Sequence, residues 1–343
     1  MKTVYSTSQS DYSIATIGSH SALQILKGAK DEGFKTICIC DKASRKPYES
    51  YRVADEILEV ESFGDFFTIE QELIKRNAVV IPHGSFISHL GPERVQDLQC
   101  FHYGSKGILI WESDRKKERQ WLLSAGLNLP KIFERPEDID CPVIVKFHGA
   151  RGGLGYFIAN STGEFYENMK RYPAEKDYVI QEYIVGVPMY CHFFYSRLTK
   201  ELEIMSFDKR YESNADSIGR IAARDQLSVH INTSYTIVGN IPVVIRESLL
   251  PQLFEMGERV VEASRDLVDA GLFGPFCLEM IVDKNLNFYV FEISARIVAG
   301  TNLYPNGSPY TDLRYDVPMS TGRRIARDIK EGIESNQFEK VLG

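Results

Sequence analysis

Two glutamates in the last third of the chain, Glu279 and Glu292, stand in a pattern that could hold a divalent cation. Each lies in an apolar run that predicts a strand, at 276–282 and 287–293, and a turn at 283–286 joins the two runs. Carboxylates that converge in otherwise apolar strands repel each other unless a cation lies between them. Mg²⁺ prefers carboxylate and phosphate oxygens. We therefore expect a magnesium site on this hairpin.

The length of the turn decides whether the two carboxylates meet. An even-numbered turn pairs Val282 with Asn287, and Glu279 and Glu292 then become diagonal neighbours on one face. A turn of three or five residues would put them on opposite faces, and two solvated glutamates at a sheet edge are the alternative. The even-numbered turn also predicts one wholly apolar opposite face, formed by Phe276, Leu278, Met280, Tyr289, Phe291 and Ile293.

A glycine-rich loop is the second candidate. The segment 149–155 holds four glycines in seven residues, between strands predicted at 142–147 and 156–159. Backbone of this kind can approach a ligand closely and turn its N–H groups toward phosphate oxygens. A Walker A loop or a dinucleotide fingerprint would need a helix after the glycines. The sequence therefore predicts a flap between two strands, with a Gly-rich surface hairpin as the alternative.

Lys146 precedes this loop inside a strand that otherwise reads as buried. A lysine there loses hydration unless it meets an anion. We therefore expect Lys146 to face a phosphate, although a lysine whose ammonium reaches solvent is the alternative.

Two further polar segments could bind a ligand or could simply be solvated. The stretch 208–214 includes Arg210 and Glu212, and its cations could meet a phosphate or a carboxylate. Asn240 lies in a predicted turn at 238–242, where asparagine is most often only a turn residue.

The elements that must position these residues begin with a β-α-β pattern. Strands are predicted at 14–17, 36–40 and 78–81, and a helix at 21–32. This order predicts a parallel sheet with helices on both faces, whose ligands bind at the carboxyl ends of the strands. Two of those ends carry polar, Gly-containing segments, one with His20 and Ser21 and the other with His83, Gly84 and Ser85. His20 and Ser21 start a helix, where an ordinary cap is the alternative to an anion site.

The rest of the chain predicts two α+β units. A charged helix at 114–125 marks the end of the first unit, and the later helices are expected at 163–172, 251–270 and 321–334. We divide the chain into an N-terminal open parallel α/β domain at 1–125, a small subdomain with the glycine flap at 126–200, and a large subdomain with the metal-binding carboxylates at 201–343.

Composition narrows the function. The net charge is −7, with 43% hydrophobic and 25% charged residues, so we expect neither nucleic-acid nor membrane partners. No apolar run reaches the roughly 18 residues needed to span a bilayer. The first ten residues are polar and lack a signal-peptide core. The six cysteines form no C-x-x-C pair, which favours reduced core thiols in a cytoplasmic protein over a zinc site.

The chain resembles the ATP-grasp superfamily. The resemblance is carried by four features in this order along the chain: Lys146, the glycine loop, the segment 181–183 and the pair Glu279/Glu292. More specifically, the chain resembles the archaeal formate-dependent FAICAR synthetases, the PurP family of purine biosynthesis. The resemblance runs from near residue 14 to near residue 334. It is carried by the segments GSHSALQ (18–24), PHGSF (82–86), KRYESN (209–214), VGNIP (238–242), GPFCL (274–278) and FEISAR (291–296).

The resemblance implies a carbon–nitrogen ligase of the ATP-grasp fold. ATP, formate and AICAR (5-aminoimidazole-4-carboxamide ribonucleotide) would give ADP, phosphate and FAICAR by way of formyl phosphate. Mg²⁺, or Mn²⁺, would be the metal cofactor and ATP a co-substrate. The resemblance further implies a homo-oligomer.

The resemblance also implies roles for single residues. The ribonucleotide would be bound by His20, Ser85 and Asn240, and the metal by Glu279 and Glu292. Arg210 and Arg296 are candidates for contacts with phosphate or the acyl phosphate. ATP would be bound by Lys146, Gly152, Gly153, Gly155, Gln181, Glu182, Tyr183 and Glu212.

Two positions depart from the pattern. Many ATP-grasp enzymes carry Asn two residues after the second metal glutamate, where this chain has Ser294, and Leu154 stands where relatives tend to have a basic residue. The alternatives are therefore an ATP-grasp ligase with another carboxylate or amine, and a non-catalytic nucleotide-binding paralogue. The intact Lys146, Glu279 and Glu292 argue against the paralogue.

Overall fold

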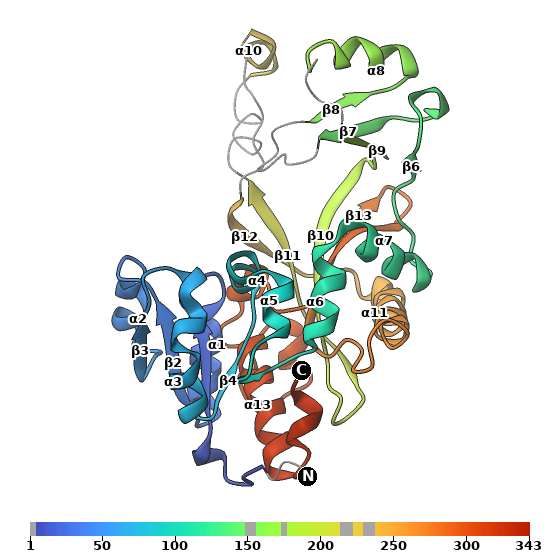
Figure 1. Cartoon of the computed structure of the whole chain (residues 1–343). Coiled ribbons are helices and arrows are strands. Elements are labelled where there is room, and N and C mark those ends of the chain that lie inside the picture. The colour runs from blue at the N-terminus through green and yellow to red at the C-terminus, as the bar shows by residue number, and fades with distance from the viewer. Residues whose placement is uncertain (1–4, 148–155, 173–176, 213–221, 229–236) are drawn as a thin grey trace.

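The computed structural model describes residues 5–147, 156–172, 177–212, 222–228 and 237–343 of the chain. Three sheets organise these residues (Figure 1). In the view of Figure 1 a small sheet lies above a long central sheet, and the N-terminal sheet lies beside the lower end of the central one.

The N-terminal sheet is parallel, as the β-α-β pattern predicts, and its strand order is β3-β2-β1-β4-β5. Strand order changes direction between β1 and β4, so the carboxyl ends of these two strands flank a crevice of the kind in which such folds bind ligands. The strands are β1 (Ser13–Ile17), β2 (Lys35–Cys40), β3 (Glu56–Glu59), β4 (Ala78–Val80) and β5 (Phe101–His102).

Helices cover both faces of this sheet. They include α1 (Ala22–Asp31), α2 (Arg45–Tyr51), α3 (Glu70–Lys75), α4 (Gly84–Leu90), α5 (Pro92–Gln96) and α6 (Lys106–Ser113), whereas the next helix, α7 (Arg115–Ser124), packs against a different sheet. Two of them, α1 and α4, begin just after β1 and β4, at the segments that hold His20 and Ser85.

The small sheet is antiparallel, with the order β6-β9-β7-β8 and the helix α8 (Thr162–Met169) beside it. Its strands are β6 (Ile132–Phe133), β7 (Val143–Phe147), β8 (Tyr156–Ala159) and β9 (Tyr178–Glu182). Val143, Val145 and Phe147 of β7 are buried in a local core, whereas the intervening Lys146 is on the other face and half-buried.

The central sheet is also antiparallel, in the order β12-β11-β10-β13-β14. Its strands are β10 (Gly186–Tyr195), β11 (Leu202–Glu212), β12 (Ile237–Val243), β13 (Gly274–Asp283) and β14 (Phe288–Ser294). One face packs against α7 and α11 to form the largest hydrophobic core. The remaining helices are α10 (Ala223–Ser228), α11 (Leu250–Ser264), α12 (Pro309–Asp312) and α13 (Thr321–Glu334), with a 3₁₀ turn η5 (Ala299–Leu303).

The hairpin of β13 and β14 differs from the prediction in its register. Val282 pairs with Phe288 rather than with Asn287, so the turn has five residues, 283–287. Asp283 Oδ1 accepts from the backbone N–H groups of Asn285 (2.8 Å) and Asn287 (2.9 Å), which holds this longer turn.

A β-bulge compensates for the odd turn. The register shifts between Glu279 and Met280 because Phe291 is an extra residue in β14, and Glu279 then pairs directly with Glu292. The two carboxylates therefore share a face, as predicted, but as opposite rather than diagonal neighbours.

The predicted apolar face of the hairpin is partly wrong. Phe288 and Val290 are the buried residues of β14 that join the core, together with Ile293, whereas Tyr289 and Phe291 are only partly buried. The one-residue difference in turn length moves each side chain before the bulge to the other face of the strand.

Candidate active site

The carboxylate pair lies in a largely buried setting. Glu279 is 2% exposed, and its Oε2 atom has no hydrogen-bond partner among the described residues. Arg210 Nη2 lies 2.5 Å from its Oε1 atom. Burial and the neighbouring charge of Glu292 raise the pKa of Glu279 to about 7, against the lowering effect of Arg210. A buried oxygen without a partner beside a second carboxylate fits a hard divalent cation.

Within the described residues, Glu279 and Glu292 are the two carboxylates that face each other on the β13–β14 hairpin. No group of three or more His, Cys, Asp or Glu side chains in the described ranges has the arrangement of a metal centre. Ser294 Oγ is 3.5 Å from Glu279 Oε1. A cation held by Glu279 and Glu292 would therefore take its further ligands from water or from a bound substrate.

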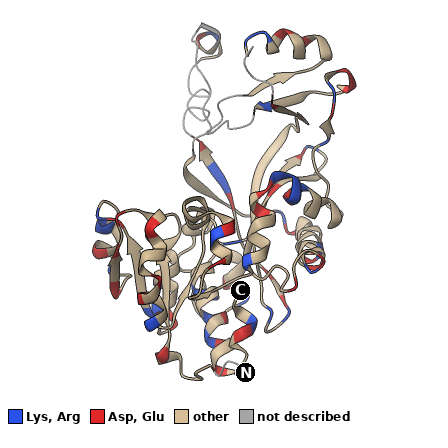
Figure 2. Ribbon diagram, in the orientation of Figure 1, with Lys and Arg blue, Asp and Glu red and all other residues tan. Residues whose placement is uncertain are grey.

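Two more carboxylates border this pair, and the sequence reasoning missed both. Glu118 of α7 accepts a hydrogen bond from Ile293 N at 2.7 Å. Glu112 of α6 accepts from Ala295 N at 3.0 Å and pairs with Arg296 Nη2 at 3.0 Å. In Figure 2, β11 and the junction of α6 with α7 each carry both basic and acidic residues. The charged sequence 114–125 is typical of a solvated helix. Only the folded chain shows that Glu118 is buried next to the Glu279/Glu292 pair.

Burial raises the pKa of both added carboxyl groups. That of Glu118 rises to about 8, and the charges of Glu292, Glu112 and Glu279 add to the effect of burial. The pKa of Glu112 also rises by burial, although the Arg296 cation opposes the shift.

Lys146 projects from the small sheet toward the same charges. Its Nζ donates to Gln181 Oε1 at 3.1 Å across β7 and β9. Burial and the cation of Arg115 lower the pKa of Lys146, whereas Glu292 raises it. Lys146 is thus close enough to Glu292 for their charges to interact, although they belong to different sheets.

The other predicted ATP residues are distributed around the two sheets. Glu182 ends β9 and its Oε2 accepts from Lys131 N at 3.0 Å, while Tyr183 follows it and is 39% exposed. Glu212 ends β11, where its charge affects the pKa of Tyr190. Gly152, Gly153 and Gly155 lie outside the described residues, as does Leu154.

The predicted ribonucleotide residues of the N-terminal sheet meet at the crevice. Ser19 and Ser85 approach within 3.0 Å through their hydroxyl oxygens. The His20 ring stacks on that of His83, with centroids 5.3 Å apart and planes 2° apart. His83 is fully buried, and its Nε2 bonds to the carbonyl of Ile17 at 3.0 Å.

These histidines are neutral at pH 7. Burial lowers the pKa of His83 to about 4. The pKa of His20 is lowered by burial of its ring and by the neighbouring His83, Arg296 and Arg210 groups. Because His20 follows β1 of the N-terminal sheet, whereas Arg210 lies on β11 and Arg296 just after β14 of the central sheet, residues of the two parts lie close together here.

Gly84 shows how closely the two parts approach. A Cβ atom on Gly84 would lie 2.9 Å from His20 Nε2 and 3.5 Å from Arg296 Cζ. Any larger residue would have to displace the His20 ring, so a glycine keeps His20 and Arg296 adjacent.

Asn240 reaches the central sheet from its edge strand β12. Its Nδ2 donates to Asp208 Oδ2 at 2.7 Å, and it pairs in register with Arg210 of β11. The predicted turn at 238–242 is therefore part of a strand. The structure connects Asn240 through Arg210 to Glu279, and so to the carboxylate pair.

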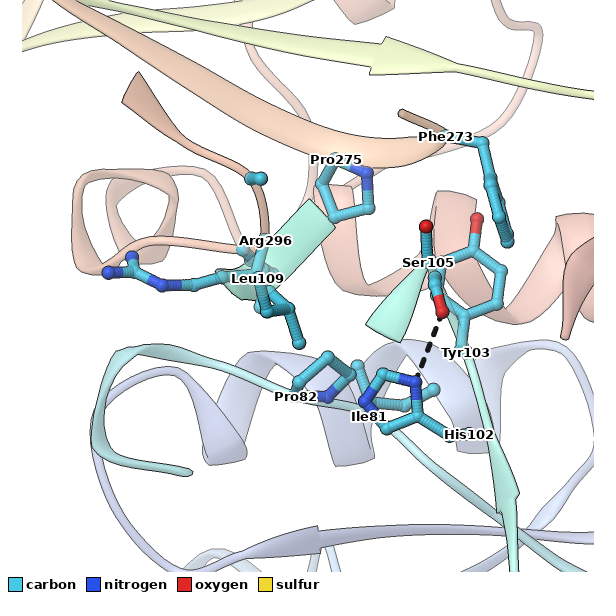
Figure 3. Close-up of a pocket in the computed structure, with 12 residues that line it drawn as sticks. Ile81, Pro82, His102, Tyr103, Ser105, Leu109, Phe273, Pro275 and Arg296 are labelled. Atoms are coloured by element: carbon cyan, nitrogen blue, oxygen red, sulfur yellow. Dashed lines mark hydrogen bonds between the residues drawn. The ribbon is translucent and has the colours of Figure 1, made fainter. Parts of the chain in front are cut away.

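A small cavity lies at the junction of the N-terminal and central sheets (Figure 3). It leaves about 10 Å³, the space of roughly one water molecule. The Arg296 guanidinium extends away from Pro82, His102 and Tyr103 in this view. The cavity is too small for a nucleotide, and Arg296 directs its charge outside it.

Two family models match the chain. One, described as "Protein of unknown function (DUF1246)", covers residues 14–133, and the other, "Domain of unknown function (DUF1297)", covers residues 167–343.

Solved structures with this fold define the class. The chain matches N5-carboxyaminoimidazole synthetase from Staphylococcus aureus complexed with ADP at a TM-score of 0.61 and 17% identity, over 87% of this chain and 74% of that chain. It matches an IMP biosynthesis protein, PurP, from Thermococcus kodakaraensis at a TM-score of 0.76 and 30% identity, over 96% of this chain and all of that chain. A parallel α/β domain followed by antiparallel sheets, together with these matches, places the chain among the ATP-grasp enzymes.

Full-length relatives narrow the class. A 5-formaminoimidazole-4-carboxamide-1-(beta)-D-ribofuranosyl 5'-monophosphate synthetase of Pyrococcus horikoshii is 56% identical over 96% of this chain and 99% of its own length. The corresponding protein of Methanocaldococcus jannaschii is 49% identical over 97% and 95%. The chain belongs to this family, the FAICAR synthetases of IMP biosynthesis.

Proposed function

We propose that this chain forms FAICAR from AICAR, formate and ATP by way of formyl phosphate. The γ-phosphoryl group passes to a formate oxygen and ADP leaves. The 5-amino nitrogen of AICAR then attacks the formyl carbon, the bond from that carbon to the phosphate oxygen breaks, and the nitrogen loses a proton.

The pairing of Glu279 with Glu292 across β13 and β14 is the observation that carries the proposal. Mg²⁺ or Mn²⁺ held there would neutralise charge on the phosphoryl groups. The buried Oε2 atom of Glu279, which lacks a partner among the described residues, supports this assignment.

The chemistry explains why ATP is needed. Formate is a poor electrophile because its negative charge repels a nucleophile. The 5-amino group of AICAR is a weak nucleophile, since its lone pair is delocalised into the ring. Phosphorylation gives formate a leaving group, and the protein then acts mainly by positioning and by electrostatic stabilisation.

On the nucleotide side, we assign Lys146 to the phosphates and Gln181, Glu182, Tyr183 and Glu212 to ATP. The hydrogen bond between Lys146 and Gln181 supports this grouping. The glycines at 152, 153 and 155 would complete the phosphate contacts.

On the acceptor side, we assign His20, Ser85 and Asn240 to AICAR. Neutral His20 can donate or accept a hydrogen bond without adding charge. Arg210 and Arg296 lie close enough to both His20 and Glu279 to affect the pKa values of both groups, so we assign them to the acyl phosphate.

Phosphate release tests the proposal. With ATP, formate and AICAR all present, we expect stoichiometric ADP, phosphate and FAICAR, and omission of formate or AICAR should abolish FAICAR formation. Full turnover with a different carboxylate in place of formate would refute the substrate assignment, and absence of any ATP turnover would indicate a non-catalytic protein.

We also propose a cytoplasmic homo-oligomer. All six cysteines are free thiols and five are buried, which suits a reducing compartment. The edge strand β12 exposes Ile237, Val238 and Ile241, and this apolar edge supports self-association. None of the described helices is long and apolar enough to cross a bilayer. Light scattering of the purified chain measures the oligomeric state, and a monomer at micromolar concentration would contradict it.

A further inference from the structure

Asn240 is held from behind by a hydrogen-bonded chain that reaches into the interior of the central sheet. Its Nδ2 donates to Asp208 Oδ2 at 2.7 Å, and His192 Nε2 lies 2.7 Å from Asp208 Oδ1. The side chains of Asp208 and His192 are each 2% exposed. Three neighbouring strands, β12, β11 and β10, each contribute one member of the chain.

Asp208 determines which way the Asn240 amide faces. A carboxylate offers only hydrogen-bond acceptors, whereas an amide has a donating NH₂ group and an accepting oxygen. The NH₂ group of Asn240 must therefore point to Asp208. The amide oxygen, on the other side of the same planar group, accepts no hydrogen bond from the described residues, and a ligand could meet it there.

His192 fixes Asp208 in turn. Its Nε2 must carry the hydrogen that the carboxylate accepts, and its Nδ1 is buried without a partner among the described residues. His192 therefore acts as a hydrogen-bond donor toward Asp208 and holds the Oδ1 side of the carboxylate in place.

The turn η5 closes over this chain and leaves no spare volume. A Cβ atom on Gly300 would lie 2.1 Å from Asp208 Oδ1 and 2.8 Å from His192 Nε2. Asn302 of the same turn donates from Nδ2 to the His20 carbonyl at 3.0 Å. One short segment thus contacts both the His20 backbone and the groups behind Asn240.

We propose that Asp208 and His192 are positioning residues that hold the Asn240 side-chain oxygen toward the ribonucleotide, where it accepts a hydrogen bond from an N–H or O–H group. The inference rests on the proposed function, because it takes Asn240 as a contact of AICAR. Amino, carboxamide and ribose hydroxyl groups are such donors. A phosphate is not, since its oxygens accept at neutral pH, so Asn240 would not bind the 5′-phosphate.

Exchanging Asp208 and Asn240 tests whether the side-chain oxygen of Asn240 faces the ribonucleotide. Asn240→Asp alone puts two carboxylates in contact, and we expect it to raise both the Kd and the KM for AICAR by roughly 30-fold or more. In the double variant Asp208→Asn/Asn240→Asp, Asn at 208 accepts from His192 and donates to Asp at 240. The outer oxygen at 240 still accepts from the substrate, so AICAR binding should recover roughly tenfold or more.

The double variant distinguishes two possibilities: residue 240 accepts a hydrogen bond from the substrate, or it donates one to the substrate. If Asn240 gave its NH₂ group to the substrate phosphate, Asp at 240 would repel that phosphate in both variants. A double variant no better than Asn240→Asp would therefore overturn the inference. Calorimetric titration with AICAR alone measures binding without turnover, so intact AICAR binding in a chain that makes no FAICAR would count against the proposed function only.

His192 and Gly300 provide independent variants that need not touch the ligand. His192→Gln keeps an amide donor near the position of Nε2, and we expect weaker AICAR binding in His192→Leu than in His192→Gln. Gly300→Ala should raise the KM for AICAR while leaving the KM for ATP within about twofold. Equal AICAR affinity in all three variants and the parent chain would contradict the proposed positioning roles.

A buried carboxylate elsewhere on β11 supplies the matched control. Glu203 is 2% exposed and accepts from Arg324 Nε at 2.9 Å. Glu203→Gln removes a buried negative charge from the same strand, so it should lower stability without changing the KM for AICAR. A KM change as large as that of His192→Leu would show that the effect is merely structural.

Discussion

At the scale of single residues, the candidate site combines acidic and basic side chains that are mostly buried. Glu112, Glu118, Glu279 and Glu292 gather near Arg210 and Arg296, and the pKa values of Glu118 and Glu279 rise to about 8 and about 7. Such shifts arise where burial and like charges disfavour ionisation. A bound cation would favour ionised Glu279, so metal binding should release protons near neutral pH.

Glu292→Ala removes one of the two proposed metal ligands. We expect ATP turnover to fall by roughly 1000-fold or more, because electrostatic stabilisation by a metal is worth several kcal/mol. Phosphate release measures turnover, and circular dichroism should show an unchanged fold. Glu258→Ala, at an exposed position of α11, is the control and should keep full activity. Retained turnover in Glu292→Ala would refute the metal role.

Lys146→Ala removes the proposed phosphate contact of the small sheet. We expect the KM for ATP to rise by roughly tenfold or more and kcat to fall, since a cation at a phosphate stabilises both bound states. Steady-state kinetics at saturating formate and AICAR give both constants. Lys284→Ala, in the exposed turn of the β13–β14 hairpin, should leave both unchanged, and an unaltered KM in Lys146→Ala would reject the assignment.

Glu118→Gln should change stability in a pH-dependent way. The pKa of Glu118 is about 8 when folded and near 4.5 when unfolded, so the stabilising effect of its proton is complete below pH 4.5. That effect is lost as the pH rises through 8. Glutamine stays neutral, so the free energy of unfolding of the variant should lie within about 1 kcal/mol of that of the parent chain at pH 5 and exceed it by ~2 kcal/mol or more at pH 9. Urea unfolding at both pH values measures this difference, and a difference independent of pH would contradict the expectation.

At the scale of elements, the sequence predicts the types of element better than their register. The parallel N-terminal sheet and the helix at 321–334 are confirmed. The β13–β14 turn was predicted one residue too short, because the pattern of apolar residues in β14 does not alternate and allows either length. Asp283 signals the longer turn, since an aspartate at this position can accept from backbone N–H groups two residues on. The β-bulge at Phe291, in contrast, has no residue in the sequence that predicts it.

Helices α1 and α13 meet through glycines, and this contact should tolerate no side chain. A Cβ atom on Gly28 would lie 2.2 Å from Arg323 N and 2.4 Å from the carbonyl carbon of Gly322. Gly28→Ala should therefore lower the free energy of unfolding by about 1–3 kcal/mol, as measured by urea unfolding. Gly163→Ala in α8 is the control, because its Cβ would have no neighbour nearer than 3.9 Å. The control should gain roughly 0.5–1 kcal/mol from helix propensity, and a similar gain in Gly28→Ala would disprove the close contact.

At the scale of the whole molecule, each of the three sheets contributes residues to the candidate site. The N-terminal sheet brings His20 and Ser85, the small sheet Lys146, and the central sheet Glu279 and Glu292. These residues could be predicted from the sequence, because local motifs and the family resemblance point to them. The sequence did not reveal Glu118 or Asp208 as buried neighbours, because charged residues in polar stretches usually face solvent and only tertiary packing shows otherwise.

A buried ionic network also ties distant parts of the chain together. Arg324 of α13 pairs with Glu203 of β11 at 2.9 Å and with Asp328 at 3.4 Å, and all three are nearly inaccessible. Asp328 further accepts from Tyr103, near the N-terminal sheet, at 3.0 Å. The network therefore fixes α13 against both larger sheets.

Arg324→Leu should lower the free energy of unfolding by about 3–5 kcal/mol, because it removes the cation that two buried carboxylates share and leaves Glu203 paired with Arg314 Nε at 3.5 Å. Denaturant unfolding monitored at α13 and at the N-terminal sheet measures the loss. Arg323→Leu removes a neighbouring arginine whose side chain is 16% exposed, and it should cost less. An equal or smaller loss for Arg324→Leu would show that the network contributes little.

The bulge at Phe291 has a consequence for how this family can diverge. Two one-residue irregularities, an odd turn and an extra strand residue, cancel so that Glu279 and Glu292 face each other. A homologue that loses a single residue from 283–287 must also lose or shift the extra residue of β14, or the two carboxylates of the proposed cation site no longer face each other. In a family alignment, gaps at these two places should be inherited together.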